Sequence, residues 1–174
     1  AAVSADGRHV AFTSAAALTT APTGGKVQLY VRDRATGTTA LASASAAGAA
    51  SDADVDAQDD GDVQFSISRD GRYVVFASRA TNLAGADADA TQDVYRKDMT
   101  TGAVVLVSVD SAGAKANAAV VGDPDVSADG NRISFGSGAA TNLAGTDANA
   151  ASSDVVVRDI AAGTTVLAAQ STVG

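Results

Sequence analysis

Two stretches of the chain collect carboxylate and amide oxygens at short spacing. They read "DADATQD" over residues 87–93 and "DANAASSD" over residues 147–154. Calcium prefers several oxygen ligands on a flexible loop, so both stretches could hold Ca²⁺. The candidate metal ligands are Asp87, Asp89, Asp93, Asp147, Asn149 and Asp154.

A second interpretation of these side chains stays open. Asp and Asn form turns by hydrogen bonding to nearby backbone groups, and they keep a surface soluble. Each stretch also offers fewer side-chain ligands than the roughly six to eight oxygens that calcium takes. The sequence therefore identifies no cofactor, and calcium is the one candidate that it offers.

A third acidic stretch, "SDADVDAQDDGD" over residues 51–62, begins like an EF-hand calcium loop. Its first three aspartates have the alternating spacing of that motif. Ala57 then stands where the motif needs glycine, and Val63 where it needs the bidentate glutamate. A calcium site of another kind and a solvated acidic loop both remain open.

The residues that carry hydrolytic chemistry are scarce in this chain. His9 is its one histidine and cysteine is absent, so a Ser-His-Asp triad could use His9 alone. No G-x-S-x-G turn is present, because "FGSGA" at residues 135–139 lacks the spacing. We therefore expect no catalytic residues in this chain.

The composition favours strands and turns. All 20 acidic residues are aspartate, which suits turns, whereas glutamate would suit helices. The net charge of -8 and the lack of a basic patch disfavour nucleic acid as a partner. No apolar run approaches the roughly 20 residues of a membrane helix, so we expect no membrane insertion. The sequence predicts an all-β fold.

The elements that would position the aspartates repeat three times. Asp-Gly pairs occur at residues 6–7, 70–71 and 129–130, each inside a Ser-x-Asp-Gly turn that precedes an alternating strand. Asp-Gly between such runs is a strong hairpin signal. A second hairpin follows in each unit, with Gly37, Gly102 or Gly163 at its turn. Each unit is thus predicted to form a four-stranded antiparallel sheet.

The pattern resembles the TolB-type, WD-repeat-like propeller repeats of bacteria. The similarity lies in "SADGRHVAFTS", in the "ATNL" steps at residues 80–83 and 140–143, and in "DVYRKDMTTG" after the aspartate-rich loop. It implies three four-stranded blades of a β-propeller in one segment, residues 1–174. The blades are expected at about 1–50, 51–113 and 114–174, as part of a six- or seven-bladed ring or as half of an oligomeric ring.

Antiparallel order assigns the charges to two faces of such a disc. The two hairpin turns of each unit share one side, here called the turn face. The loop between the hairpins and the connection to the next unit share the other side, called the loop face. Most aspartates outside the turns fall on the loop face, so the sequence predicts that this face is acidic.

The resemblance implies a noncatalytic binding or scaffold module of an exported bacterial protein, located in the periplasm, at the cell surface or outside the cell. We expect a protein or glycan partner at the acidic loop face. One alternative is the substrate-gating propeller of a larger hydrolase, such as a prolyl-oligopeptidase-like peptidase. Another is a self-associating structural module. The ring would be closed by further blades of the same chain or by a second copy.

Overall fold

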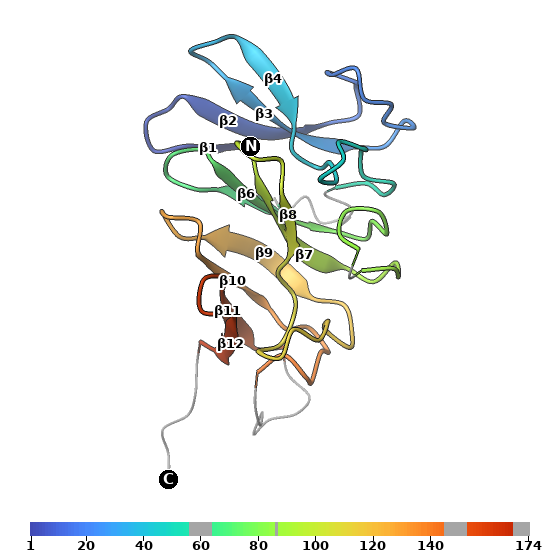
Figure 1. Ribbon diagram of the computed structural model, residues 1–174, viewed down its shortest axis with the longest axis vertical. Helices are drawn as coiled ribbons and strands as arrows, with labels where there is room; N and C mark the ends of the chain where they lie inside the picture. Colours follow the sequence, from blue (N-terminus) through green and yellow to red (C-terminus); the bar gives the residue numbers. More distant parts are fainter. Residues whose placement is uncertain (56–63, 86, 145–152, 169–174) are drawn as a thin grey trace.

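The computed structural model describes residues 1–55, 64–85, 87–144 and 153–168. Its regular structure consists of strands in three four-stranded sheets, each antiparallel and ordered as in the chain (Figure 1). Sheet 1 contains β1 (Ala2–Val3), β2 (His9–Ser14), β3 (Gln28–Asp33) and β4 (Thr38–Leu41). Sheet 2 contains β5 (Phe65–Ile67), β6 (Tyr73–Ser78), β7 (Asp93–Asp98) and β8 (Val104–Leu106). Sheet 3 contains β9 (Val121–Val126), β10 (Arg132–Gly136), β11 (Val155–Asp159) and β12 (Thr164–Leu167). The predicted all-β class with three blade-like sheets is confirmed.

The first hairpin of each sheet closes through the predicted Ser-x-Asp-Gly turn. In sheet 1 the Asp6 carboxylate accepts from the Ser4 hydroxyl at 2.6 Å and from the Arg8 amide at 2.9 Å. The Ser4 oxygen in turn accepts from the His9 amide at 2.9 Å. Gly7 has a φ of 70°, a left-handed conformation that favours glycine. Sheets 2 and 3 repeat these bonds with their own serine, aspartate and glycine.

The core lies between the sheets. One apolar cluster joins sheets 1 and 2 and includes Leu29, Val31 and Phe76. A second joins sheets 2 and 3 and includes Val75 and Phe135. Burial of each such side chain contributes roughly 1.5–3 kcal/mol, so stacking is the main source of stability. Among the residues that the structure describes, sheet 2 is covered on both sides, whereas sheets 1 and 3 are each covered on one.

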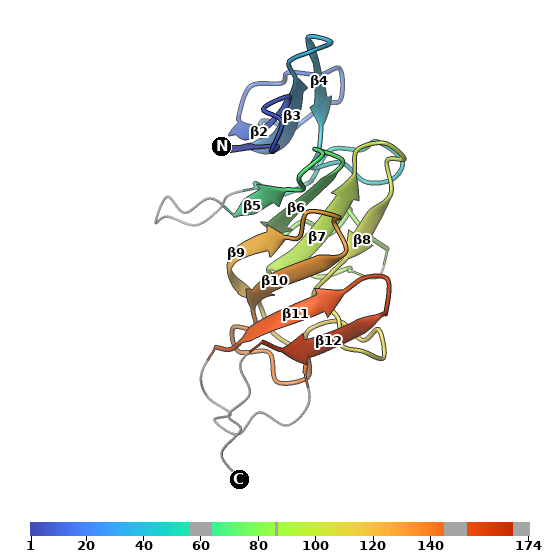
Figure 2. The same cartoon turned by 90° about the vertical axis from the view of Figure 1, so that its left-hand side faces the viewer.

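The outer sides of the end sheets carry exposed apolar residues. Val3 on β1 is 58% exposed, and Val155 and Val166 in sheet 3 are 51% and 53% exposed. The neighbouring Val156 is buried against sheet 2, and alternation along the strand points Val155 away from it. Figures 1 and 2 show the sheets stacked along the long axis, with the N-terminus at sheet 1.

The loop and turn faces are arranged as the sequence predicts. Figure 1 shows the first-hairpin turns on one side of the stack and the β2–β3 and β6–β7 loops on the other. The connection from sheet 1 to sheet 2 meets a loop of sheet 2, where the Asp52 carboxylate accepts from the Thr81 amide at 2.9 Å. Among the residues described, no helix is long and apolar enough to cross a bilayer.

Candidate functional site

The loop between β6 and β7 brings three of the predicted ligands together. Carboxylate oxygens of Asp87, Asp89 and Asp93 all lie within 4.8 Å of one another. The Asp87 and Asp93 side chains are fully buried, while that of Asp89 is 59% exposed. These three residues are called the aspartate cluster below.

The second predicted set is described only at Asp154. Asp147 and Asn149 lie outside the described residues. Asp154 precedes β11, where its amide donates to the Ser137 hydroxyl at 3.0 Å and its carbonyl oxygen accepts from the Ser137 amide at 2.7 Å. These are backbone contacts of a strand end, and they leave the calcium prediction for this set untested.

The side chain of Lys115 lies at the centre of the aspartate cluster. Its Nζ is 2.6 Å from Asp87 Oδ1, 2.6 Å from Asp89 Oδ1 and 2.8 Å from Asp93 Oδ2. Sequence reasoning missed this residue. Lys115 belongs to the connection from sheet 2 to sheet 3, where it pairs with Val109 in an isolated antiparallel bridge.

Neutral hydroxyl groups complete the surroundings of the cluster. The Ser108 hydroxyl donates to Asp93 at 2.6 Å, and the Tyr95 hydroxyl hydrogen-bonds to the Asp87 carboxylate. Lys115 Nζ also donates to Thr91 Oγ1 at 3.0 Å. Asp93 and Tyr95 both belong to β7, so a strand buried between two sheets holds the inner part of the cluster in place.

The electrostatics of the cluster reflect burial and this shared cation. Burial acts to lower the pKa of Lys115, but its hydrogen bonds to the three carboxylates more than compensate and hold that pKa above its usual range. The hydrogen bond from Lys115 lowers the pKa of Asp89, with further help from Thr91. Burial raises the pKa of Asp93, although Lys115 and Ser108 act in the opposite direction.

Three carboxylates around one ammonium leave an excess of negative charge when all are ionised. Asp89 is the member that presents this charge to solvent. The arrangement can therefore attract a cation or a hydrogen-bond donor of a partner. Calcium would have to displace the Lys115 ammonium from the centre, because the same oxygens contact both. Calcium binding by this cluster stays a prediction.

Sheet 1 has neutral residues at the positions of Asp93 and Lys115. Gln28 occupies the position of Asp93, five residues before the aspartate that ends the strand. Its Oε1 accepts from the Ser43 hydroxyl at 2.7 Å, as Asp93 accepts from Ser108. Ala50 bridges to Ala44 as Lys115 bridges to Val109, so an alanine takes the place of the lysine. The fold does not require the charges.

The repeated Thr-Asn step holds the connection between sheets. Asn82 Nδ2 donates to the Ala50 carbonyl at 2.8 Å, while the neighbouring Thr81 contacts Asp52. At the next junction Asn142 Nδ2 donates to the Lys115 carbonyl at 2.8 Å. Each Thr-Asn step is followed by a buried leucine, at 83 and 143. The phrase is repeated because it fastens each loop to the incoming connection, and at sheet 3 it also fixes the backbone of Lys115.

The acidic stretch of residues 51–62 is described as far as residue 55. Asp52 contacts Thr81, and the Asp54 carboxylate accepts from the Val27 amide at 2.7 Å. Lys26 Nζ lies 3.9 Å from the other Asp54 oxygen. The remaining aspartates of the stretch, Asp56, Asp59, Asp60 and Asp62, lie outside the described residues. The two described carboxylates thus hold backbone and threonine groups of separate loops.

No protein-family model matches this sequence, and no curated protein matches it. Among solved structures, the chain is similar to TolB from Acinetobacter baumannii, with a TM-score of 0.52 and 16% identity over 99% of this chain and 32% of that chain. Putative TolB from Agrobacterium tumefaciens gives 0.50 and 14%, over 95% and 47% of the two chains. The tricorn protease gives 0.52 and 15%, over 95% and 12%.

The chain thus spans less than half the length of each of these proteins. At such identities the likeness shows the fold and not the activity. The three sheets have the fold of TolB-like β-propeller blades, as the repeats predict.

Proposed function

We propose that this chain is a noncatalytic binding module, part of a β-propeller of an exported bacterial protein, and that its loop face binds a protein or glycan partner. The observation that carries the proposal is the aspartate cluster. Its three carboxylates carry more negative charge than the one lysine ammonium neutralises. Asp89 presents this excess negative charge on the loop face. Hydrogen-bond donors of a glycan or cationic side chains of a protein would complement it.

Matched charge variants on the two faces test this proposal. Asp89→Asn with Asp154→Asn removes two charges from the loop face, and Asp6→Asn with Asp129→Asn removes two from the turn face. Binding to a glycan array and to a panel of purified bacterial envelope proteins is then compared. We expect the loop-face variant to lose binding and the turn-face variant to keep it. Equal losses would reject the loop face as the binding surface, and turnover of ester, peptide or glycoside substrates would reject the noncatalytic role.

A gating propeller of a larger hydrolase is the second candidate. The observation that favours it is the likeness to the tricorn protease, of which the chain covers 12%. The sequence of the full-length gene separates the two candidates. An adjoining α/β-hydrolase segment with a Ser-His-Asp set would support the gating role, whereas further blades without such a segment would support the binding module.

Self-association is favoured by the outer sides of the end sheets, where Val3, Val155 and Val166 are exposed. Propellers typically close with about 4–8 blades, so these surfaces fit either further blades of the same chain or a second copy. Exposed apolar patches mark such contacts. Light scattering across a concentration series would detect the second copy.

For calcium we propose a specific relation to Lys115. In sheet 2 the Lys115 ammonium occupies the place that the sequence predicts for a metal ion. Calcium binds this cluster only when that ammonium is displaced. A carboxylate trio without the lysine would retain the negative oxygen ligands that Ca²⁺ prefers. Removal of the lysine should therefore increase calcium affinity.

A further inference from the structure

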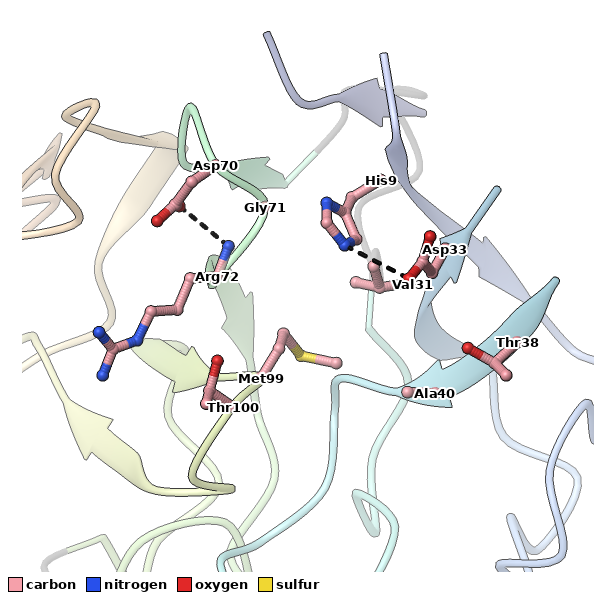
Figure 3. Close-up of a pocket in the computed structure, with 10 residues that line it drawn as sticks. All are labelled: His9, Val31, Asp33, Thr38, Ala40, Asp70, Gly71, Arg72, Met99 and Thr100. Carbon is pink, nitrogen blue, oxygen red and sulfur yellow. Dashed lines mark hydrogen bonds and ion pairs between the residues drawn. The ribbon is translucent and has the colours of Figure 1, made fainter. Parts of the chain in front are cut away.

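A cavity of about 370 Å³ lies between sheets 1 and 2 near the turn face (Figure 3). His9 and Val31 line it from sheet 1, while the turn at Asp70 and Gly71 and the side chain of Met99 line it from sheet 2. The lining combines two carboxylates, the Arg72 side chain, the histidine ring, threonines and apolar side chains. The cavity lies apart from the aspartate cluster, so a ligand bound there is independent of any partner at the loop face.

The two sheet junctions are built alike around this place. A Cβ added to Gly71 would lie 2.3 Å from His9 Nδ1, so the histidine ring packs directly on that glycine. At the next junction a Cβ added to Gly130 would lie 2.0 Å from Tyr73 Cδ2. His9 and Tyr73 hold the same position, two residues after the turn glycine of their own sheet. Each ring therefore packs on the turn glycine of the following sheet.

At the second junction the space beside the ring is filled by Arg96. Its Cζ lies 4.6 Å from the centroid of the Tyr73 ring, and its Nη1 donates to the Gly130 carbonyl at 2.7 Å. The residue that corresponds to Arg96 in sheet 1 is Val31, each lying two positions before the aspartate that ends its strand. The cavity is thus the volume that an arginine side chain occupies one junction further on.

Two carboxylates, Asp33 and Asp70, line the cavity. Asp33 Oδ2 lies 3.9 Å from His9 Nε2, and the same carboxylate is paired with the Arg8 guanidinium at 2.7 Å, so Asp70 is the carboxylate that a bound cation would meet. The Asp70 carboxylate accepts from two uncharged donors, the Ser68 hydroxyl at 2.7 Å and the Arg72 amide at 3.0 Å. The Arg72 guanidinium is paired with Asp98 at 2.8 Å, and in Figure 3 it points away from His9 and Asp33.

We propose that this cavity binds the guanidinium group of an arginine side chain from a partner protein. The Gly71 carbonyl and the His9 ring take the roles that the Gly130 carbonyl and the Tyr73 ring have for Arg96. Apolar contacts with Val31 and Met99 accommodate the aliphatic part of the arginine, whose stem is commonly buried while its head is hydrogen-bonded.

The chain offers two unambiguous reporters for a test. It contains one histidine and one methionine, and both line the cavity. Nuclear magnetic resonance signals of the His9 ring and the Met99 methyl group are followed while N-acetyl-arginine methylamide is added. We expect saturable shifts of both signals, with at least about tenfold weaker binding of the uncharged citrulline analogue because charge-assisted hydrogen bonds are lost. Absent saturation, or equal affinity for the two probes, would overturn the proposal.

Variants separate the cavity from other surfaces. Val31→Arg copies Arg96 and should abolish the probe-induced shift of Met99. Val157→Arg places the same residue at the corresponding position of sheet 3 and should leave the shift unchanged. Should Val31→Arg fail to fold, Asp70→Asn keeps the turn's acceptor, removes one cavity charge and should weaken binding severalfold. Unchanged probe binding in Asp70→Asn, or in a folded Val31→Arg, would contradict the proposal.

Discussion

The two junctions between sheets share one backbone design and differ in charge. On the loop face the first junction places Gln28 and Ala50 where the second places Asp93 and Lys115. The serine that donates to the glutamine or the aspartate is retained, at 2.7 Å in the first case and 2.6 Å in the second. A neutral and an ionic solution thus occupy the same site of the fold.

The turn face shows a parallel difference. His9 and Val31 at the first junction correspond to Tyr73 and Arg96 at the second. The smaller side chains of the first junction do not fill the space between the sheets, and the cavity remains there. The hairpins and the apolar contacts between sheets are common to both junctions. We infer that repeated residues make the blade, while the residues that differ between repeats make individual sites.

The largest effect is expected from removing the cation of the ionic junction. Lys115→Met leaves two fully buried carboxylates without their positive partner, and breaking such a buried pair costs about 3–5 kcal/mol. Denaturant unfolding measures the loss. Lys115→Ala combined with Asp93→Gln copies the alanine and the glutamine of the first junction, and it should be more stable than Lys115→Ala alone because one fewer buried carboxylate is left without a cation. A double variant less stable than the single one would refute the equivalence of the junctions.

A smaller effect is expected at the turn glycines. Gly71→Val and Gly7→Val both place a β-branched residue at positive φ, at 75° and 70°, which costs about 1–3 kcal/mol. Only at Gly71 would the new Cβ also collide with His9, whereas no atom lies within 4 Å at Gly7. We expect Gly71→Val to be the more damaging by about 1–3 kcal/mol. Equal denaturant midpoints would mean that the two sheets do not pack through this turn.

The end sheets should differ from the covered middle sheet in association. Val155→Lys with Val166→Lys places charges on the outer side of sheet 3, and we expect less dye binding and less self-association by light scattering. Both residues are about half exposed, so stability should change by less than about 1 kcal/mol. An unchanged scattering profile, with wild type already monomeric and dye-free, would reject a role of these surfaces in closing a ring.

The smallest effects concern stability in acid, where Asp129 and Asp93 change the free energy of unfolding with pH in opposite directions. Hydrogen bonds from Ser127 and the Asn131 amide lower the pKa of Asp129 to about 2. The contribution of Asp129 to folding stability is therefore present above the ordinary aspartate pKa of 3.8 and is lost as the pH falls through about 2. Burial raises the pKa of Asp93, so its contribution is lost instead as the pH rises through that raised value. Melting temperatures of Asp129→Asn and Asp93→Asn across the acidic range should deviate from wild type in opposite directions.

The sequence predicted the features that local chemistry determines. The Ser-x-Asp-Gly hairpins, the three antiparallel sheets and the shared loop face follow from turn residues and alternation, and all are confirmed. Lys115 could not be found in this way, because it lies 28 residues from Asp87 and belongs to the next connection. The cavity was equally hidden, since it results from the small volume of Val31 relative to Arg96.

Lys115 serves as the cation of the aspartate cluster in the loop between β6 and β7. Calorimetric titration of Ca²⁺ into wild type and Lys115→Met tests it most directly. We predict that Lys115→Met binds calcium at least about tenfold more tightly than wild type, since the competing ammonium is gone. The further change Asp87→Asn in that variant should weaken the binding again. Equal calcium affinity of wild type and Lys115→Met would contradict the claim.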